Sequence, residues 1–130
     1  MEKYDLIIVG AGPAGIFTAV ELLRHGSKKK MLLVEKGKPV EKRHCPKAEV
    51  GHCVNCRPTC AITTGFSGAG AFSDGKLSLS YQVGGELPEL IGEDFAQELI
   101  NYTDKISLEF GADPHVYGIY EGSEIKELRK

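Results

Sequence analysis

The sequence predicts an α/β fold built on a parallel sheet, and three features of its first 35 residues carry this prediction. Residues 6–9 (LIIV) form an apolar run that predicts a strand, and residues 31–34 (MLLV) form a short, wholly apolar run, as expected of a parallel strand covered on both faces. Between them, residues 13–25 place apolar side chains at helical spacing, and Gly26 offers a C-terminal stop. A strand, a helix and a second strand in this order predict a βαβ unit.

A glycine-rich turn, residues 10–15 (GAGPAG), joins the first strand to the helix. We expect Gly10 to permit a tight turn, Gly12 to let the backbone approach a pyrophosphate, and Gly15 to let helix and strand pack closely. Pro13 suits the first helical turn, because its missing N–H is not needed there. Phosphates would lie at the positive end of the helix, so the pattern predicts a dinucleotide site.

Glu35 follows the second strand, twenty positions beyond the last glycine of the turn. At that place a carboxylate can accept hydrogen bonds from both ribose hydroxyls of an adenosine, and it would repel the 2′-phosphate of NADP. A surface βαβ unit with incidental glycines is the alternative, which the glycines, their context and the acidic residue together disfavour. The spacing alone does not separate FAD from NAD.

The length suits one domain that spans residues 1–130. The formal net charge of -2 gives no electrostatic case for binding nucleic acid or an anionic membrane. The N-terminal apolar run is too short for a signal peptide or a membrane span, so we expect a cytoplasmic protein.

Residues 123–130 begin like a helix, with a serine cap followed by apolar residues, and then the sequence stops. A helix that opens at this point suggests an N-terminal fragment of a longer protein or one piece of a split gene. A frayed surface tail is the alternative.

A second glycine-rich stretch spans residues 65–76 and leaves backbone N–H groups accessible, which suits a flat or anionic ligand or else a flexible loop. Residues 77–81 alternate apolar and polar side chains, which predicts a half-buried strand and a small antiparallel piece of sheet. Residues 94–110 carry apolar and aromatic side chains at helical spacing, and we expect these side chains to form core.

Four cysteines with two adjacent histidines fall in one short segment. The thiols are those of Cys45, Cys53, Cys56 and Cys60. They can share a zinc ion or an iron–sulfur cluster, form a redox-active dithiol, or remain unligated buried thiols. Their spacing matches no standard zinc pattern well, so the sequence leaves these alternatives open.

Three blocks resemble the N-terminal part of FAD-dependent dehydrogenases in the flavoprotein superfamily with two dinucleotide-binding domains. They are residues 5–15 (DLIIVGAGPAG), 34–37 (VEKG) and 68–77 (GAGAFSDGKL). The resemblance covers most of residues 5–80 and implies a Rossmann-like FAD/NAD(P)-binding domain. It also implies that the cofactor is FAD rather than NAD.

The resemblance further implies roles for individual residues. The pyrophosphate would be lined by residues of the first turn: Gly10, Gly12, Pro13, Ala14 and Gly15. Glu35 would hold the adenosine ribose, and Lys36 would border the adenine pocket. Arg43 lies where related flavoproteins often place an arginine that contacts the pyrophosphate, although it can equally be a solvated member of a charged run. The segment that passes the flavin face would be Gly68, Ala69 and Gly70.

The leading interpretation is therefore the FAD-binding portion of a flavin-dependent oxidoreductase whose substrate is unknown. The late Gly-Asp segment that usually completes such a site is not recognisable, so we expect this chain alone to be inactive. A C-terminal portion would have to be supplied in the same chain or by a partner. The alternatives are a metal- or thiol-centred binding module on a dinucleotide fold, and an NAD-binding domain.

Overall fold

The computed structural model describes residues 2–117, so the helix expected over residues 123–130 lies outside the described part. The chain divides into two compact units, Met1–Lys76 and Leu77–Lys130. The single domain expected over residues 1–130 stays a prediction. No helix within residues 2–117 combines the length and the apolar character needed to cross a membrane.

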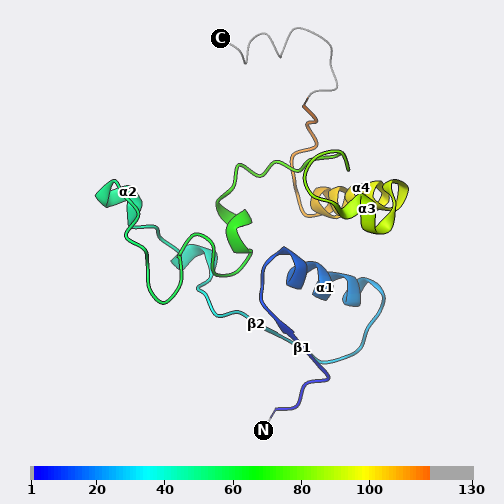
Figure 1. Ribbon diagram of the computed structural model, residues 1–130. Helices are drawn as coiled ribbons and strands as arrows, with labels where there is room; N and C mark the ends of the chain where they lie inside the picture. The colour runs from blue at the N-terminus through cyan, green and yellow to red at the C-terminus, as the bar shows by residue number, and fades with distance from the viewer. Residues whose placement is uncertain (1, 118–130) are drawn as a thin grey trace, which may run out of the picture. The chain divides into compact units, whose positions relative to one another are not determined.

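The first unit begins with the βαβ arrangement that the sequence predicts (Figure 1). Strand β1 (Leu6–Val9) leads into helix α1 (Pro13–Arg24), which leads into strand β2 (Met31–Val34). The two strands pair in parallel, from Leu6 opposite Met31 to Val9 opposite Val34. The prediction of an α/β fold with a parallel sheet is thus confirmed.

Strand β1 is not covered on both faces within the described residues. Its residues alternate, with Leu6 and Ile8 partly covered and Ile7 and Val9 exposed. Helix α1 contacts both strands, but a single helix can cover only one face of a sheet. The apolar residues on the other face of β1 therefore remain on the surface.

The three motif glycines lie in three different environments. Gly10 has a φ of 101°, a conformation that glycine adopts without strain. A Cβ atom on Gly15 would collide with the carbonyl oxygen of Gly10 and lie 3.3 Å from Ile8 Cγ2. Gly12 has an ordinary φ of -77°, and nothing lies within 4 Å of the position of its Cβ. The turn and packing roles expected of Gly10 and Gly15 are seen, and the space beside Gly12 is open.

The rest of the first unit is a long loop with three short helical segments. They are η1 (Val40–Lys42), α2 (Lys47–Val50) and η2 (Gly68–Phe72). The loop returns to the glycine turn, because the Phe66 N–H donates to the Lys38 carbonyl at 3.2 Å and the Ser67 N–H donates to the Ala11 carbonyl at 2.7 Å. The two glycine-rich segments of the sequence are therefore hydrogen-bonded neighbours.

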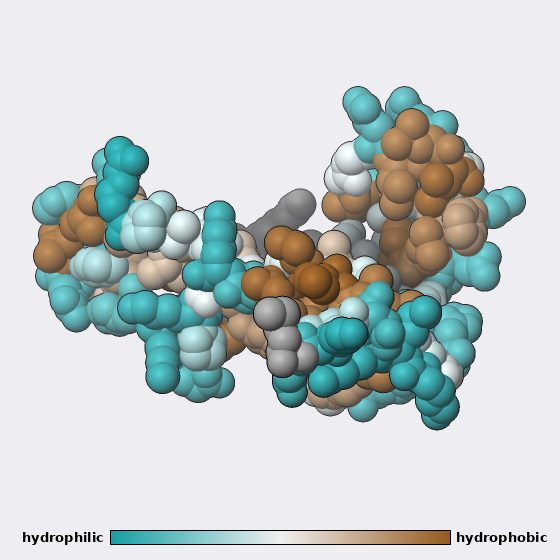
Figure 2. Space-filling view, turned by 90° about the horizontal axis from the view of Figure 1, so that it is seen from below, coloured by the Kyte–Doolittle hydropathy of each residue, from teal (hydrophilic) through white to brown (hydrophobic). Residues whose placement is uncertain are grey.

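The second unit is helical, with α3 (Leu87–Ile91) followed by α4 (Glu93–Glu109). Helix α4 confirms the helix predicted over residues 94–110. Its side chains form less core than expected: Ala96 and Ile106 are buried, whereas Phe95 is 49% exposed and Phe110 is 76% exposed. Figure 2 shows hydrophobic residues at the surface. By their exposed fractions, Phe95 and Phe110 are among the exposed hydrophobic residues of this unit.

The strand predicted over residues 77–81 is wrong, and with it the small antiparallel piece of sheet. Residues 77–80 have no regular secondary structure. The side-chain amide of Gln97 on α4 takes the place of a partner strand, since its Nε2 donates to the Leu79 carbonyl at 3.0 Å and its Oε1 accepts from the Tyr81 N–H at 3.3 Å. A strand needs a row of backbone partners, which a single side chain does not supply.

We predict that Gly15→Ala lowers the free energy of unfolding by roughly 1–3 kcal/mol, because the new methyl group would be forced against the Gly10 carbonyl. Gly70→Ala is the matched control, since nothing lies within 4 Å of the position of a Cβ there and its effect should stay within about 0.5 kcal/mol. Urea denaturation of both variants measures the difference. Equal stability of the two variants would contradict the close packing of α1 on β1.

Candidate functional site

The Glu35 carboxylate joins the end of β2 to the glycine turn. Its Oε2 accepts the N–H of Ala11 at 2.8 Å, and its Oε1 accepts the N–H of Gly37 at 2.8 Å. Alongside, the Gly10 N–H donates to the Val34 carbonyl at 2.7 Å, and Ala11 is fully buried. The sequence predicts only a ligand-binding role for Glu35, and the structure adds a role in holding the turn.

These two hydrogen bonds also favour the ionised form of the Glu35 carboxyl group. The N–H of Ala11, then the N–H of Gly37, lower the pKa of the Glu35 carboxyl below its ordinary value, and the nearby charge of the exposed Lys36 adds a smaller effect. Each carboxylate oxygen has two lone pairs. One accepted N–H on each oxygen therefore leaves acceptor capacity for a ligand hydroxyl.

The first turn of α1 has no capping side chain. Its N-cap is Gly12, which has no side chain to accept a hydrogen bond from the helix, and Pro13 follows as the first helical residue. The first N–H groups of a helix have no partner within the helix and carry partial positive charge. Because the space beside Gly12 is open, an anionic group can approach these donors closely.

The second glycine-rich segment lies against this turn. A Cβ on Gly68 would be 3.6 Å from Pro13 Cδ and 3.7 Å from Gly12 Cα. Ser67 and Gly68 both have positive φ angles, of 67° and 60°, which turn the chain into η2. The structure thus brings Gly68 next to two residues of the first motif, while Ala69 and Gly70 follow as exposed residues of η2.

Arg43 has partners other than the pyrophosphate that the resemblance implies. It is only 7% exposed. Its Nε donates to the Ala61 carbonyl at 2.9 Å, and its Nη1 donates to the Phe66 carbonyl at 2.8 Å. Its Nη2 donates to the Ile62 carbonyl, and the guanidinium carbon lies 4.7 Å from the centre of the Phe72 ring. Arg43 therefore organises the backbone that leads to η2, and its contact with phosphate stays a prediction.

Two further glycines, which have no separate role in the predictions from sequence, allow close packing of the backbone beside this site. A Cβ on Gly37 would collide with the backbone of Gly65. A Cβ on Gly65, whose φ is 136°, would lie 2.5 Å from the Lys38 carbonyl oxygen and 2.8 Å from Arg43 Cδ. Their position beside the two recognised motifs is the signal in the sequence that could have found them.

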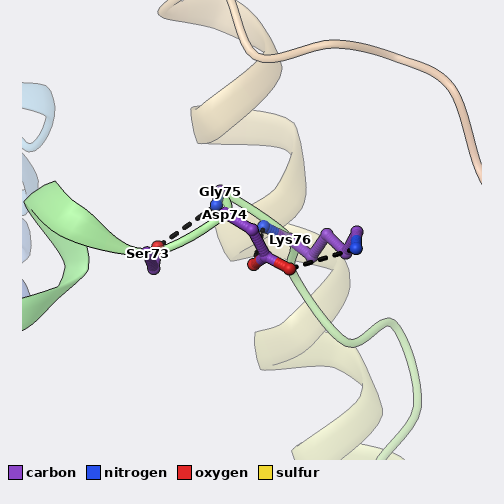
Figure 3. Close-up of polar contacts among 4 residues, drawn as sticks. All are labelled: Ser73, Asp74, Gly75 and Lys76. Atoms are coloured by element: carbon purple, nitrogen blue, oxygen red, sulfur yellow. Dashed lines mark hydrogen bonds and ion pairs between the residues drawn. The ribbon is translucent and has the colours of Figure 1, made fainter.

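The Ser-Asp-Gly-Lys block after η2 forms a local turn (Figure 3). Ser73 Oγ accepts the N–H of Gly75 at 3.2 Å, and Asp74 Oδ1 accepts the N–H of Lys76 at 3.3 Å. Lys76 Nζ lies 3.0 Å from Asp74 Oδ2, and this contact lowers the pKa of the Asp74 carboxyl. Both side chains are mostly exposed, so the pair adds little to stability.

The four cysteines all line one cavity of about 410 Å³. All are free thiols: Cys53 and Cys60 are exposed, and Cys45 and Cys56 are half-buried. Hydrogen bonds from the backbone N–H groups of Thr63 and then Ile62 lower the pKa of the Cys60 thiol. The expected roles of these thiols as metal ligands stay predictions without support here, because in the described part no three His, Cys, Asp or Glu side chains are grouped to hold a metal ion.

Comparison with known protein families gives a match in the N-terminal half of the chain. Residues 3–56 match the family described as "FAD binding domain". An "Uncharacterized protein" of Clostridium beijerinckii is 40% identical over 72 residues, which are 55% of this chain and 13% of that protein. The "Putative FAD-dependent oxidoreductase LodB" of Marinomonas mediterranea is 51% identical over 37 residues, 28% of this chain and 10% of LodB. No solved structure gives a significant match.

The aligned segments cover only a small part of either relative's length. The region matched by the family, residues 3–56, includes the glycine turn of this chain. The N-terminal part of the chain is therefore similar to FAD binding domains, and the similarity to a protein named as a putative FAD-dependent oxidoreductase extends over 37 residues.

We predict that Glu35→Gln destabilises the protein at neutral pH and that the difference from the unsubstituted protein shrinks in acid. The folded pKa of Glu35 is lowered. Its contribution is therefore present above the unfolded value of about 4.3 and is lost as the pH falls through the folded pKa. Thermal melting at pH 7 and pH 3 measures this, with Glu41→Gln at an exposed position as the control. A Glu35→Gln difference that is equal at both pH values would contradict it.

We predict that Arg43→Lys lowers the free energy of unfolding by roughly 2–3 kcal/mol, because an ammonium group cannot reproduce three directed bonds of a buried guanidinium. The same change at the exposed Arg57 is the control and should have little effect. Chemical denaturation gives both values. An Arg43→Lys protein as stable as the Arg57→Lys protein would refute the role assigned to the guanidinium.

Proposed function

The chain carries an FAD binding domain match in residues 3–56, and we propose that it is the cofactor-binding portion of a flavin-dependent dehydrogenase with a Rossmann-like fold. One observation carries the proposal: the open space beside Gly12, at the uncapped start of α1. A side chain would fill that space, and the first backbone N–H groups of α1 have no capping side chain. These are the properties expected of a surface that accepts a pyrophosphate.

The residues around this space fit the parts of FAD. The N–H groups at the start of α1, from Ala14 onward, would receive the pyrophosphate. Glu35 is ionised, and its remaining lone pairs would accept the ribose hydroxyls of the adenosine. Lys36 would border the adenine. The flavin would pass the segment that begins at Gly68, which lies against Gly12.

When bound, FAD would supply an isoalloxazine ring that exchanges electrons with a substrate. The contribution of this chain would be to bind the cofactor and orient it. Arg43 acts at this level, because it donates to the carbonyl groups of residues 61, 62 and 66 and so fixes the approach of η2 to the glycine turn. The fixed backbone would limit the positions that the flavin can occupy.

The matched residues are a small share of the length of each relative, so a complete enzyme of this kind would contain more polypeptide than these residues. A ligand of the size of FAD needs most of its surface buried for tight binding. The described residues would contact the adenosine and the pyrophosphate, and we infer that further polypeptide, in the same chain or a partner, contacts the ribitol and the distal flavin face. The substrate would be bound there.

We predict that Gly12→Val weakens FAD binding by roughly a hundredfold or more, because the new side chain would occupy the space intended for the pyrophosphate. The φ of Gly12 is ordinary and no atom is close, so the variant should fold. Titration of FAD into the purified chain, followed by flavin fluorescence, measures the affinity.

Thr18→Val is the matched control, because it places the same side chain on an exposed position of α1. It should bind FAD like the unsubstituted protein, and circular dichroism should show all three proteins folded. If the Gly12→Val protein is folded and binds FAD with unchanged affinity, the placement of the pyrophosphate is wrong. Failure of the unsubstituted chain to bind FAD or ADP would overturn the proposed function.

A further inference from the structure

The cavity of the cysteine segment is a second candidate site, separate from the residues assigned to the dinucleotide. It measures about 410 Å³, which is within the range of small-molecule pockets. Residues 45–47 and 53–61 line it. The chain has four cysteines, and every one of them lines this cavity. Such convergence of all the thiols on one space is the observation on which the inference rests.

The neighbouring histidines do not complete a metal site with these thiols. His44 Nε2 lies 2.9 Å from Glu49 Oε1, and His52 Nδ1 lies 3.0 Å from the Val50 carbonyl oxygen. Neither histidine lines the cavity. The described residues thus place free thiols around the cavity without the grouped ligands that a metal requires. One reaction open to such thiols is exchange with the disulfide of a ligand.

The thiols differ in accessibility, so the exposed thiols and the half-buried thiols suit different roles. Cys53 and Cys60 are exposed, so an incoming molecule can reach them. Cys56 is half-buried and only three residues from Cys53, in a Cys-x-x-Cys arrangement. Lys47 and Arg57 also line the cavity and bring positive charge. A small molecule with negative charge is therefore favoured there.

We propose that this cavity is a thiol–disulfide exchange site for small anionic organic disulfides. The thiolate of Cys53 or Cys60 attacks one sulfur of the disulfide, forms a mixed disulfide and releases the first thiolate of the ligand. The thiolate of Cys56 then attacks the protein sulfur of the mixed disulfide, closes an intramolecular disulfide and expels the second thiolate. Two electrons pass from the cysteine pair to the ligand, and the two protons of the cysteine thiols go to solvent or to the released thiolates.

The test uses the full chain, freshly reduced, and one equivalent of 5,5′-dithiobis(2-nitrobenzoate), an anionic aromatic disulfide. Paired thiols should release both halves of the reagent as thiolate, and the protein should lose the mass of two hydrogen atoms without gaining an adduct. Cys56→Ser should release one half and retain the other on Cys53 or Cys60. Thr59→Ser, which changes a residue of the same cavity that has no thiol, should behave like the unsubstituted protein.

Three results would overturn the proposal. The first is an unsubstituted chain that keeps a stable aromatic adduct and releases only one thiolate. The second is a Cys56→Ser protein that still forms an intramolecular disulfide without an adduct. The third is zinc or iron bound through the thiols of the purified chain, detected by elemental analysis before reduction. No flavin takes part in these measurements, so their outcome is independent of the Gly12→Val experiment.

Discussion

The pair of hydrogen bonds accepted by the Glu35 carboxylate is the interaction on which the candidate site depends. One bond reaches Ala11 in the glycine turn and the other reaches Gly37 at the start of the following loop. A single side chain thereby joins the carboxyl end of β2 to the entrance of α1. A charged acceptor forms stronger hydrogen bonds than a neutral one, so the position of the turn is set by an ionised group. The carboxylate that we propose for the ribose is therefore also part of the scaffold of the site.

The second constraint is the buried guanidinium of Arg43. Its three donor atoms bind carbonyl groups of residues 61, 62 and 66, in a loop that has little regular secondary structure. Buried backbone carbonyls need donors, and in this loop a side chain supplies them. The loop then returns to the glycine turn through the bond from the Ser67 N–H to the Ala11 carbonyl. Ala11 thus donates to Glu35 and accepts from Ser67, which links both glycine-rich segments at one residue.

The cysteine segment depends on different physics. It has one short helix, α2, and the residues around its cavity are mostly exposed. Few apolar contacts hold such a segment, so its conformation rests on local hydrogen bonds, such as those between Pro46 and the N–H groups of Glu49 and Val50. Covalent closure between thiols would restrict the segment further. The proposed dinucleotide site and the thiol cavity therefore depend on different interactions within the same unit.

The sequence by itself determined the βαβ unit, the helix of residues 94–110, and the separate reasons for Gly10 and Gly15. These features follow from periodicity and from conformational limits that act over a few residues. Only the tertiary structure decided the partners of Glu35 and Arg43, because hydrogen bonds between residues about 20 positions apart leave no local pattern. The same reason applies to residues 77–81, whose alternating pattern predicts a strand. In the structure, the Gln97 side chain is hydrogen-bonded to the Leu79 carbonyl and the Tyr81 N–H, so these backbone groups do not pair with a strand.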